Sequence, residues 1–410
     1  MPPFHRLILS FMMCVLLLSG AACTSNRAQQ GGPDNNGTEI TVTGPNTDVQ
    51  DPGDFNYTGN AILINGKVRV AVLLPLSGRA AKVGKSILNA AQMALFEFGN
   101  TMVELRPYDT RGTEDGAASA ALLAVDEQAS LVLGPLFSES VLAVTPILQG
   151  AGVPAVAFSN NMSVADDGIF VMGFLPSQEV DTVVRFAISR GVDRLAILAP
   201  DNDYGNIAVE ALSNAAYDQG ATLAHVALYD PEAGDPTPVV KELAQRYTRD
   251  RAYNGLLLAE GGRRLASVAA LLPYYYIDPK RVQIMGTGQW DVPGIGTEPA
   301  LNGAWFAAPS DATRAAFMER YERTYGEPPA RLATLGYDAA ALAVVLAGRE
   351  GGPDYSPEAI TDPKGFAGQD GVFRFFYSGG NERGYAIKQV EDRENRVLVP
   401  APTTFDTLGF

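Results

Sequence analysis

The chain is poor in cysteine, histidine and positive charge, and each shortage excludes a class of function. Its 410 residues include two cysteines and two histidines, and no Cys/His spacing suits zinc. Lysine and arginine number 31 against 46 acidic residues, a net charge of −15, so we expect no nucleic-acid partner. No Gly-x-Ser-x-Gly motif occurs, and His225 falls inside a predicted strand. We therefore expect no enzyme, no metal and no cofactor.

The N-terminus has the layout of a secretory signal peptide. Arg6 precedes an apolar run, Leu7 to Leu18, that is too short to span a bilayer. The small residues Ser-Gly-Ala-Ala follow at 19–22. We expect residues 1–22 to be removed on export, which predicts a protein of the bacterial envelope.

Cys23 directly follows this segment, in a setting that resembles the lipobox of bacterial lipoproteins. That pattern prefers leucine three places earlier, where this chain has Gly20. Two alternatives stay open: Cys23 is lipidated and anchors the chain to the membrane, or cleavage after Ala22 releases a free periplasmic protein. Cys14 leaves with the signal peptide, so the one remaining thiol has no internal disulfide partner, which favours lipidation.

The segment that follows is polar. Residues 24–60 are rich in Gly, Asn, Asp, Pro and Thr and hold few apolar residues, so burial cannot offset the entropy of ordering them. We expect residues 23–65 to comprise the lipid anchor site and a disordered tether. The alternative is an edge strand at Glu39–Thr43.

Short apolar strands alternate with helical patterns from Val68 onward. This alternation predicts an α/β fold with parallel sheets covered on both faces. The expected strands are 68–74, 102–106, 131–134, 155–158, 169–172, 195–198, 222–229, 255–258 and 282–285. The expected helices include 117–127, 180–189, 208–218 and 239–249.

Roughly nine strands before residue 290 indicate two sheets, and therefore two lobes. We expect an N-terminal lobe of residues 66–178 plus 308–355, to which the helical segments 312–325 and 330–348 return. The C-terminal lobe is expected to hold residues 179–307 plus 356–400. Within it, Phe373–Phe376 and Tyr385–Val390 are predicted to form a hairpin around a Gly-rich turn.

Polar residues cluster where the predicted strands end, which is where open parallel sheets bind ligands. Hydroxyl, amide and carboxylate groups there suit a small polar ligand such as an amino acid. The candidate ligand-binding residues are Ser77, Ser138, Ser159, Asn160, Tyr204, Glu260 and Gln289. The alternative for each serine, aspartate or asparagine in these loops is that it caps the following helix.

Two motifs that resemble known sites fail on spacing. Gly78 and Gly84 precede Lys85 like a phosphate-binding loop, but five residues separate the glycines where four are required. The loop from Asp201 resembles a calcium loop, but its sixth and twelfth positions are Asn206 and Leu212 instead of glycine and glutamate.

Four segments resemble, in order and spacing, the type I periplasmic binding proteins, which include the leucine/isoleucine/valine-binding proteins. They are 70–78 (Val-Ala-Val-Leu-Leu-Pro-Leu-Ser-Gly), 131–138 with its Gly-Pro and serine, 152–155 (Gly-Val-Pro-Ala) and 203–205 (Asp-Tyr-Gly). The resemblance implies two Rossmann-like lobes, three crossovers and a hinged cleft. It also implies ligand contacts at Ser138, in the loop 159–163 and at Tyr204, with Glu260 as the candidate partner of a ligand ammonium group.

Within this superfamily the chain looks most like the penicillin-binding protein activators, which are outer-membrane lipoproteins. Segments 73–81 and 134–137 carry this likeness. Our first hypothesis is a non-enzymatic envelope lipoprotein that regulates peptidoglycan synthesis by contact with a penicillin-binding protein. The best-known activators carry a helical-repeat domain where this chain has its polar segment, and a second hypothesis stays open. It is a solute receptor for an ABC permease, with an amino acid of the branched-chain type or a similar small polar molecule as ligand.

Overall fold

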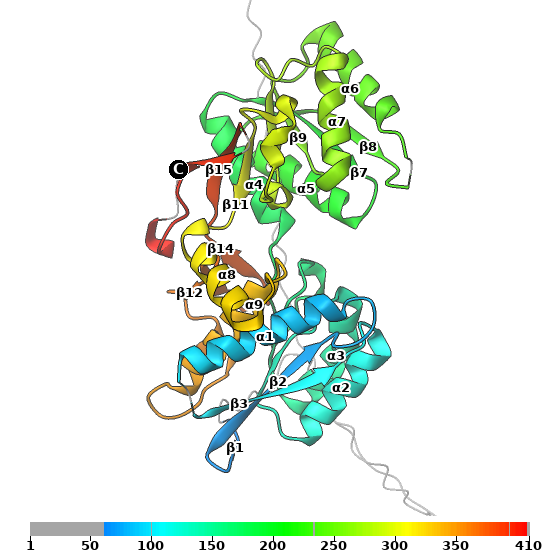
Figure 1. Ribbon diagram of the computed structural model, residues 1–410. Helices are drawn as coiled ribbons and strands as arrows, with labels where there is room; N and C mark the ends of the chain where they lie inside the picture. Colours follow the sequence, from blue (N-terminus) through cyan, green and yellow to red (C-terminus); the bar gives the residue numbers. More distant parts are fainter. Residues whose placement is uncertain (1–60, 100, 233, 393, 408–410) are drawn as a thin grey trace, which may run out of the picture. The chain divides into compact units, whose positions relative to one another are not determined.

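The computed structural model describes residues 61–99, 101–232, 234–392 and 394–407 (Figure 1). All of them belong to one compact unit, residues 52–410. The predicted signal peptide, the lipidation site Cys23 and the tether up to residue 60 lie outside the described residues. The end of the predicted tether is different: Leu63–Ile64 form strand β1, which pairs antiparallel with β2, so the described residues from Leu63 onward are ordered.

The first lobe is built on a six-stranded sheet. Strand β2 pairs parallel with β3 and β4, and β4, β5 and β6 continue the parallel order. The strands are β2 (Lys67–Leu74), β3 (Val103–Asp109), β4 (Leu131–Leu133), β5 (Ala155–Ala157) and β6 (Ile169–Val171). Its helices are α1 (Ala81–Glu97), α2 (Glu114–Asp126) and α3 (Ser138–Ala151), with the short η1 (Met162–Val164).

Both faces of this sheet are buried because successive side chains of β2 point to opposite sides. Val70, Val72 and Leu74 belong to a core shared with α1 and α9, whereas Ala71 and Leu73 belong to a core shared with α2 and α3. The helices therefore form a layer on each side of the sheet (Figure 1). This is why the sequence of β2 is a near-continuous apolar run and does not alternate.

The second lobe is built on a seven-stranded sheet of order β16-β15-β11-β10-β9-β7-β8. Strands β7 to β11 are parallel, β15 pairs antiparallel with β11, and β16 pairs antiparallel with β15. The strands are β7 (Arg194–Pro200), β8 (Thr222–Tyr229), β9 (Gly255–Leu258), β10 (Gln283–Gly286), β11 (Trp305–Ala308), β15 (Ala386–Glu391) and β16 (Glu394–Val399). The helices are α4 (Pro176–Ser189), α5 (Asp203–Asp218), α6 (Thr237–Asp250) and α7 (Gly262–Tyr274), with the short η2 (Gly288–Trp290), η3 (Ile295–Thr297) and η4 (Pro299–Leu301). His225 lies on β8, at the edge of this sheet, within 3.3 Å of Glu242.

The chain then returns to the first lobe. These elements are α8 (Asp311–Tyr325), α9 (Ala333–Ala347), α10 (Pro357–Ile360), β12 (Phe366–Gly368), β13 (Gly371–Phe375) and β14 (Asn381–Arg383), and η5 (Phe405–Thr407) lies near the C-terminus. Phe317 of α8 and Leu335 of α9 are buried in the same core as Val70 and Val72.

The expected division of the C-terminal part is wrong for residues 356–383. Ile360, Phe373 and Phe375 are buried in the core of the first lobe, and β12–β13–β14 form a separate three-stranded sheet. The predicted hairpin is also wrong in its second strand, because β13 pairs with β14 and the next strand, β15, pairs with β11 and β16. Two residues separate β14 from β15 as the chain changes lobe, too short a break for hydrophobic periodicity to reveal.

No helix among the described residues combines the length and the apolar character needed to cross a membrane.

The placement of β13 predicts that its aromatic side chains stabilise the first lobe. Phe373 is 1% exposed, so Phe373→Ala should lower the free energy of unfolding by about 3 to 5 kcal/mol through lost burial and a residual cavity. Phe376 lies three residues on and is 43% exposed, so Phe376→Ala should change it by less than about 1 kcal/mol. Urea unfolding followed by circular dichroism measures both, and equal effects would contradict this packing.

Candidate ligand site

In the first lobe, polar residues meet at the edge where the parallel strands end. Ser138 follows β4 and Ser159 follows β5, and their hydroxyl oxygens lie 3.0 Å apart. The Ser159 hydroxyl also accepts the backbone N–H of Asn161 at 3.1 Å. Two hydroxyl groups carry two protons and share one between them, so the pair can donate the second proton to a ligand acceptor.

Backbone dipoles point toward the same place. Helix α3 begins at Ser138, and its N-cap residue, Phe137, has no side-chain acceptor for the first N–H groups of the helix. The positive end of this helix therefore favours an anionic group, although Glu139 in the first turn opposes it in part. A ligand carboxylate suits this edge.

A mostly apolar cavity of about 330 Å³ is lined by chain neighbours of the two serines, although neither serine lines it itself. Phe137, Phe158 and Asn160, which adjoin Ser138 and Ser159 in the chain, are among its lining residues. The remaining lining residues are Ala80, Val83, Leu136, Gly173, Phe174 and Leu332. The cavity can therefore accept an apolar group from a molecule whose polar group binds the serines.

Ser77 and Asn160 complete the predicted set in the first lobe. Both are exposed at the same edge, and Asn160 lines the cavity whereas Ser77 does not. The backbone N–H of Ser77 donates to Asp109 at 3.2 Å, so this residue takes part in the turn after β2. The turn supports the structural alternative for Ser77.

In the second lobe, the predicted residues also lie at the ends of parallel strands. The Tyr204 hydroxyl lies 2.8 Å from the Thr287 hydroxyl, after β7 and β10 respectively. Glu260, after β9, accepts the hydroxyl of Tyr229 and, at 3.3 Å, the backbone N–H of Gly261. Gln289 is exposed, and its side chain packs so close to Gly261 that an added Cβ would lie 2.4 Å from Gln289 Oε1. Glu260 and Gln289 are therefore neighbours, and Glu260 offers a negative charge at this edge.

Sequence reasoning missed Glu179, a buried carboxyl group at this edge. It lies in the first turn of α4, and its Oε2 accepts the N–H of Gly288 at 2.9 Å. Burial raises its pKa to about 7, and the hydrogen bond from Gly288 and the charge of Arg331 only partly oppose this shift. An acidic residue in a first helical turn is common for local reasons, so no sequence signal linked Glu179 to a loop 109 residues away.

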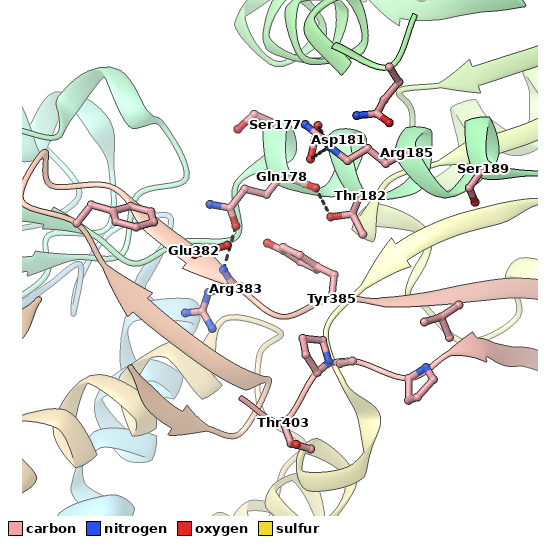
Figure 2. Close-up of a pocket in the computed structure, with 16 residues that line it drawn as sticks. Ser177, Gln178, Asp181, Thr182, Arg185, Ser189, Glu382, Arg383, Tyr385 and Thr403 are labelled. Atoms are coloured by element: carbon pink, nitrogen blue, oxygen red, sulfur yellow. Dashed lines mark hydrogen bonds and ion pairs between the residues drawn. The ribbon is translucent and has the colours of Figure 1, made fainter. Parts of the chain in front are cut away.

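A separate groove of about 1190 Å³ contains none of the predicted ligand residues. Figure 2 shows α4 along one side and residues 400–403 along the other, with Tyr385 between them. The charged side chains of α4 in the groove are paired with each other, since Arg185 Nε lies 2.7 Å from Asp181 Oδ1.

The arrangement of two sheets, each with polar groups at the carboxyl ends of its parallel strands, agrees with the match of this chain to a protein family. A model of the family described as "Periplasmic binding protein" matches residues 67–367. The chain belongs to this family. The predicted fold class, with two parallel-sheet lobes of the type I periplasmic binding protein kind, is confirmed.

Curated relatives of this periplasmic binding protein are distant and partial. An uncharacterized protein of Rickettsia prowazekii is 22% identical over 55% of this chain and 62% of its own length. The Leu/Ile/Val-binding protein homolog 6 of Brucella abortus is 27% identical over 43% of this chain and 47% of its length. The penicillin-binding protein activator LpoA of Vibrio cholerae is 27% identical over 37% of this chain and 26% of its length. The chain thus spans from a quarter to under two thirds of these relatives.

Solved structures match over more of the chain. A putative branched-chain amino acid ABC transporter protein of Rhodospirillum rubrum has a TM-score of 0.72 at 22% identity and covers 81% of this chain and 100% of its own. LivJ of Streptococcus pneumoniae, in complex with isoleucine, has a TM-score of 0.60 at 16% identity over 82% of this chain and 100% of its own. At these identities the matches support the fold.

The buried carboxyl of Glu179 predicts a pH-dependent stability. Its pKa is about 7 when folded against an ordinary 4.5, so the folded state binds the proton more tightly. The stability that it contributes is fully present below pH 4.5 and is lost as pH rises through 7. Glu179→Gln imitates the protonated form, so its stability relative to the natural protein should rise by about 2 to 3 kcal/mol from about pH 5 to about pH 8.

Chemical unfolding at several pH values measures this change, and the exposed Glu210→Gln on α5 is the matched control. Burial also raises the pKa of Asp338 to about 7. Because Asp338 is unchanged in the natural protein and in both variants, its contribution to the pH dependence cancels when they are compared. A difference between Glu179→Gln and the natural protein that stays constant with pH would contradict the assignment.

Proposed function

We propose that this protein is a solute receptor of the bacterial envelope that binds a small carboxylic acid with an apolar side chain, an amino acid in particular. The observation that carries the proposal is the Ser138–Ser159 hydroxyl pair together with the apolar cavity that chain neighbours of the two serines line. The hydroxyl pair and the start of α3 suit a carboxylate, and the cavity suits an apolar side chain. A cavity of about 330 Å³ is at the small end of ligand pockets, which fits a molecule of this size.

Glu260 supplies the complementary charge for an amino acid. Its carboxylate lies at the edge of the second lobe and is half-buried, beside Tyr229 and Gln289. A ligand ammonium group would pair with it, while Tyr204 and Thr287 offer hydroxyl groups on the same edge. In this proposal the two lobes recognise opposite ends of the ligand, and an ABC permease of the inner membrane is the partner that receives it.

The ligand hypothesis predicts a change in thermal stability. Amino acids and small carboxylic acids are screened for a rise in the melting temperature of the protein. A compound that binds only the folded protein stabilises it by about 4 kcal/mol at a concentration of 1,000 times its Kd. Ser138→Ala removes a hydrogen bond to a charged group and should weaken binding by roughly 10- to 100-fold. Ser267→Ala, on the exposed side of α7, is the matched control and should bind normally.

The variant Glu260→Gln distinguishes amino acids from carboxylic acids that have no amino group. An amino acid should lose affinity in this variant because its ammonium group loses a charged partner, whereas an acid without an amino group should not. If no compound raises the melting temperature of the natural protein, the receptor hypothesis fails. The activator hypothesis would then be the one to pursue, by crosslinking this chain to a penicillin-binding protein in envelopes. The partial similarity to LpoA is the observation that favours it.

We also propose that Cys23 anchors the protein to the envelope by lipidation, with the outer membrane as the expected location. Cells grown with a labelled fatty acid should incorporate it into the natural protein, and Cys23→Ser should abolish the incorporation. Cys14→Ser is the control, because Cys14 lies in the predicted signal peptide and should leave the labelling intact. Labelling that survives in Cys23→Ser, or is absent from the natural protein, would instead support a free periplasmic form.

A further inference from the structure

A cluster of buried charges adjoins the loop that carries Thr287 and Gln289. Asp291 directly follows η2, and its backbone N–H donates to Gly288 at 3.0 Å. Its carboxylate is 6% exposed. The loop after β10, residues 287–291, therefore ends in a charge that must be paired.

The two partners of Asp291 come from different lobes. Lys388, on β15 of the second lobe, donates to Asp291 Oδ1 at 2.8 Å and is 1% exposed. Arg314, on α8, lies 2.5 Å from Asp291 Oδ2 and is 14% exposed. Helix α8 packs in the core of the first lobe through Phe317 and Tyr321. One carboxylate is thus bonded to both lobes.

The surrounding charges hold this arrangement in place. Asp311 lies 2.6 Å from Lys388 Nζ and also pairs with Arg314, and the fully buried Asp370 lies 3.8 Å from Arg314. Burial alone would raise the pKa of Asp291, but the hydrogen bonds and charges of Arg314 and Lys388 outweigh it and hold that pKa below its ordinary value. Asp291 is therefore ionised over the physiological range.

The loop connects this charge to the candidate ligand residues. Trp290, fully buried, precedes Asp291 and donates its indole N–H to the backbone oxygen of Glu260 at 2.8 Å. An added Cβ at Gly286 would lie 2.1 Å from the Trp290 ring, so the glycine lets the indole pack against the end of β10. A shift of Asp291 would move Trp290, and through it both Gln289 and Glu260.

We propose that Asp291 and Arg314 are positioning residues that fix the loop 287–291 of the second lobe to α8 of the first lobe. The inference rests on the proposed function for its effect on ligand affinity, but the fixation of the loop can be measured without ligand. Neither residue lies among those proposed to contact the ligand. Their pairing makes the geometry of the ligand loop depend on the orientation of α8, and hence on the relative movement of the lobes.

The experiment compares Arg314→Met with Arg323→Met in the full-length chain. Arg323 is on the same helix and pairs with Glu319 at 2.7 Å, but both side chains are more than half exposed, 67% and 76%. Hydrogen exchange of the amides of 289–291 is measured without ligand. These amides bond within the loop, to Thr287 and Gly288. Arg314→Met should speed their exchange at least tenfold relative to the amides of β7, and Arg323→Met should leave it unchanged.

Two further variants keep the test decisive if Arg314→Met folds poorly. Asp291→Asn should speed exchange in the same loop. Arg314→Lys keeps the positive charge, so its loop amides should exchange more slowly than those of Arg314→Met. Loop exchange that is unchanged in a folded Asp291→Asn or Arg314→Met protein overturns the inference.

Leucine is the probe for the effect on binding. If leucine binds, Arg314→Met should weaken its binding at least fivefold. An unchanged affinity in a variant with a loosened loop would overturn the positioning role. If leucine and the other compounds do not bind the natural protein while the loop loosens as expected, the receptor hypothesis fails but the fixation of the loop stands.

Discussion

The burial of two parallel sheets on both faces is the constraint on which the rest of the structure depends. Strands such as β2 and β9 have no polar face, because helices cover each side. Polar side chains of these central strands then emerge where the strands end, and parallel strands end at a common edge. The hydroxyl pair of Ser138 and Ser159, and the Glu260–Gln289 neighbourhood, are consequences of this constraint.

A second consequence is that charge inside the protein is concentrated near the places where the chain changes lobe. Arg383 ends β14 with 3% exposure; it donates to the backbone oxygen of Met172 at 2.8 Å and lies over the rings of Phe174 and Phe373. Lys388, on the next strand β15, is also buried, and it pairs with Asp291 and Asp311. Buried charges are tolerated when they are paired and hydrogen-bonded, and their geometry is then strict. Hydrogen-bonded ion pairs between the lobes therefore require particular distances and angles, whereas apolar contacts do not.

The same features distinguish the two functional hypotheses in physical terms. A receptor needs polar groups on both strand-end edges and space for a ligand between polar and apolar surfaces, and the first lobe offers the hydroxyl pair and a cavity of about 330 Å³. An activator that works by protein contact needs neither. Exposed aromatic residues such as Tyr274 and Tyr276 at the end of α7 would suit protein contact, but Tyr275 between them packs against the core of the second lobe. That helix end is therefore explained at least in part by packing.

The sequence by itself determined strands β2 to β10, their parallel character and the edge where polar residues gather, because apolar runs and the helices between them are local signals. It could also place Ser138, Ser159, Tyr204 and Glu260 at strand ends. Only the tertiary structure decided which of them meet: the serine pair joins residues 21 apart, and Tyr204 meets Thr287 across 83 residues. It alone placed β13 and β14 in the first lobe, and it alone revealed Glu179 beside Gly288 and Asp291 between Lys388 and Arg314. These pairings depend on how separate elements pack and on the absence of water around buried charges, and neither property is encoded in the local pattern of any one segment.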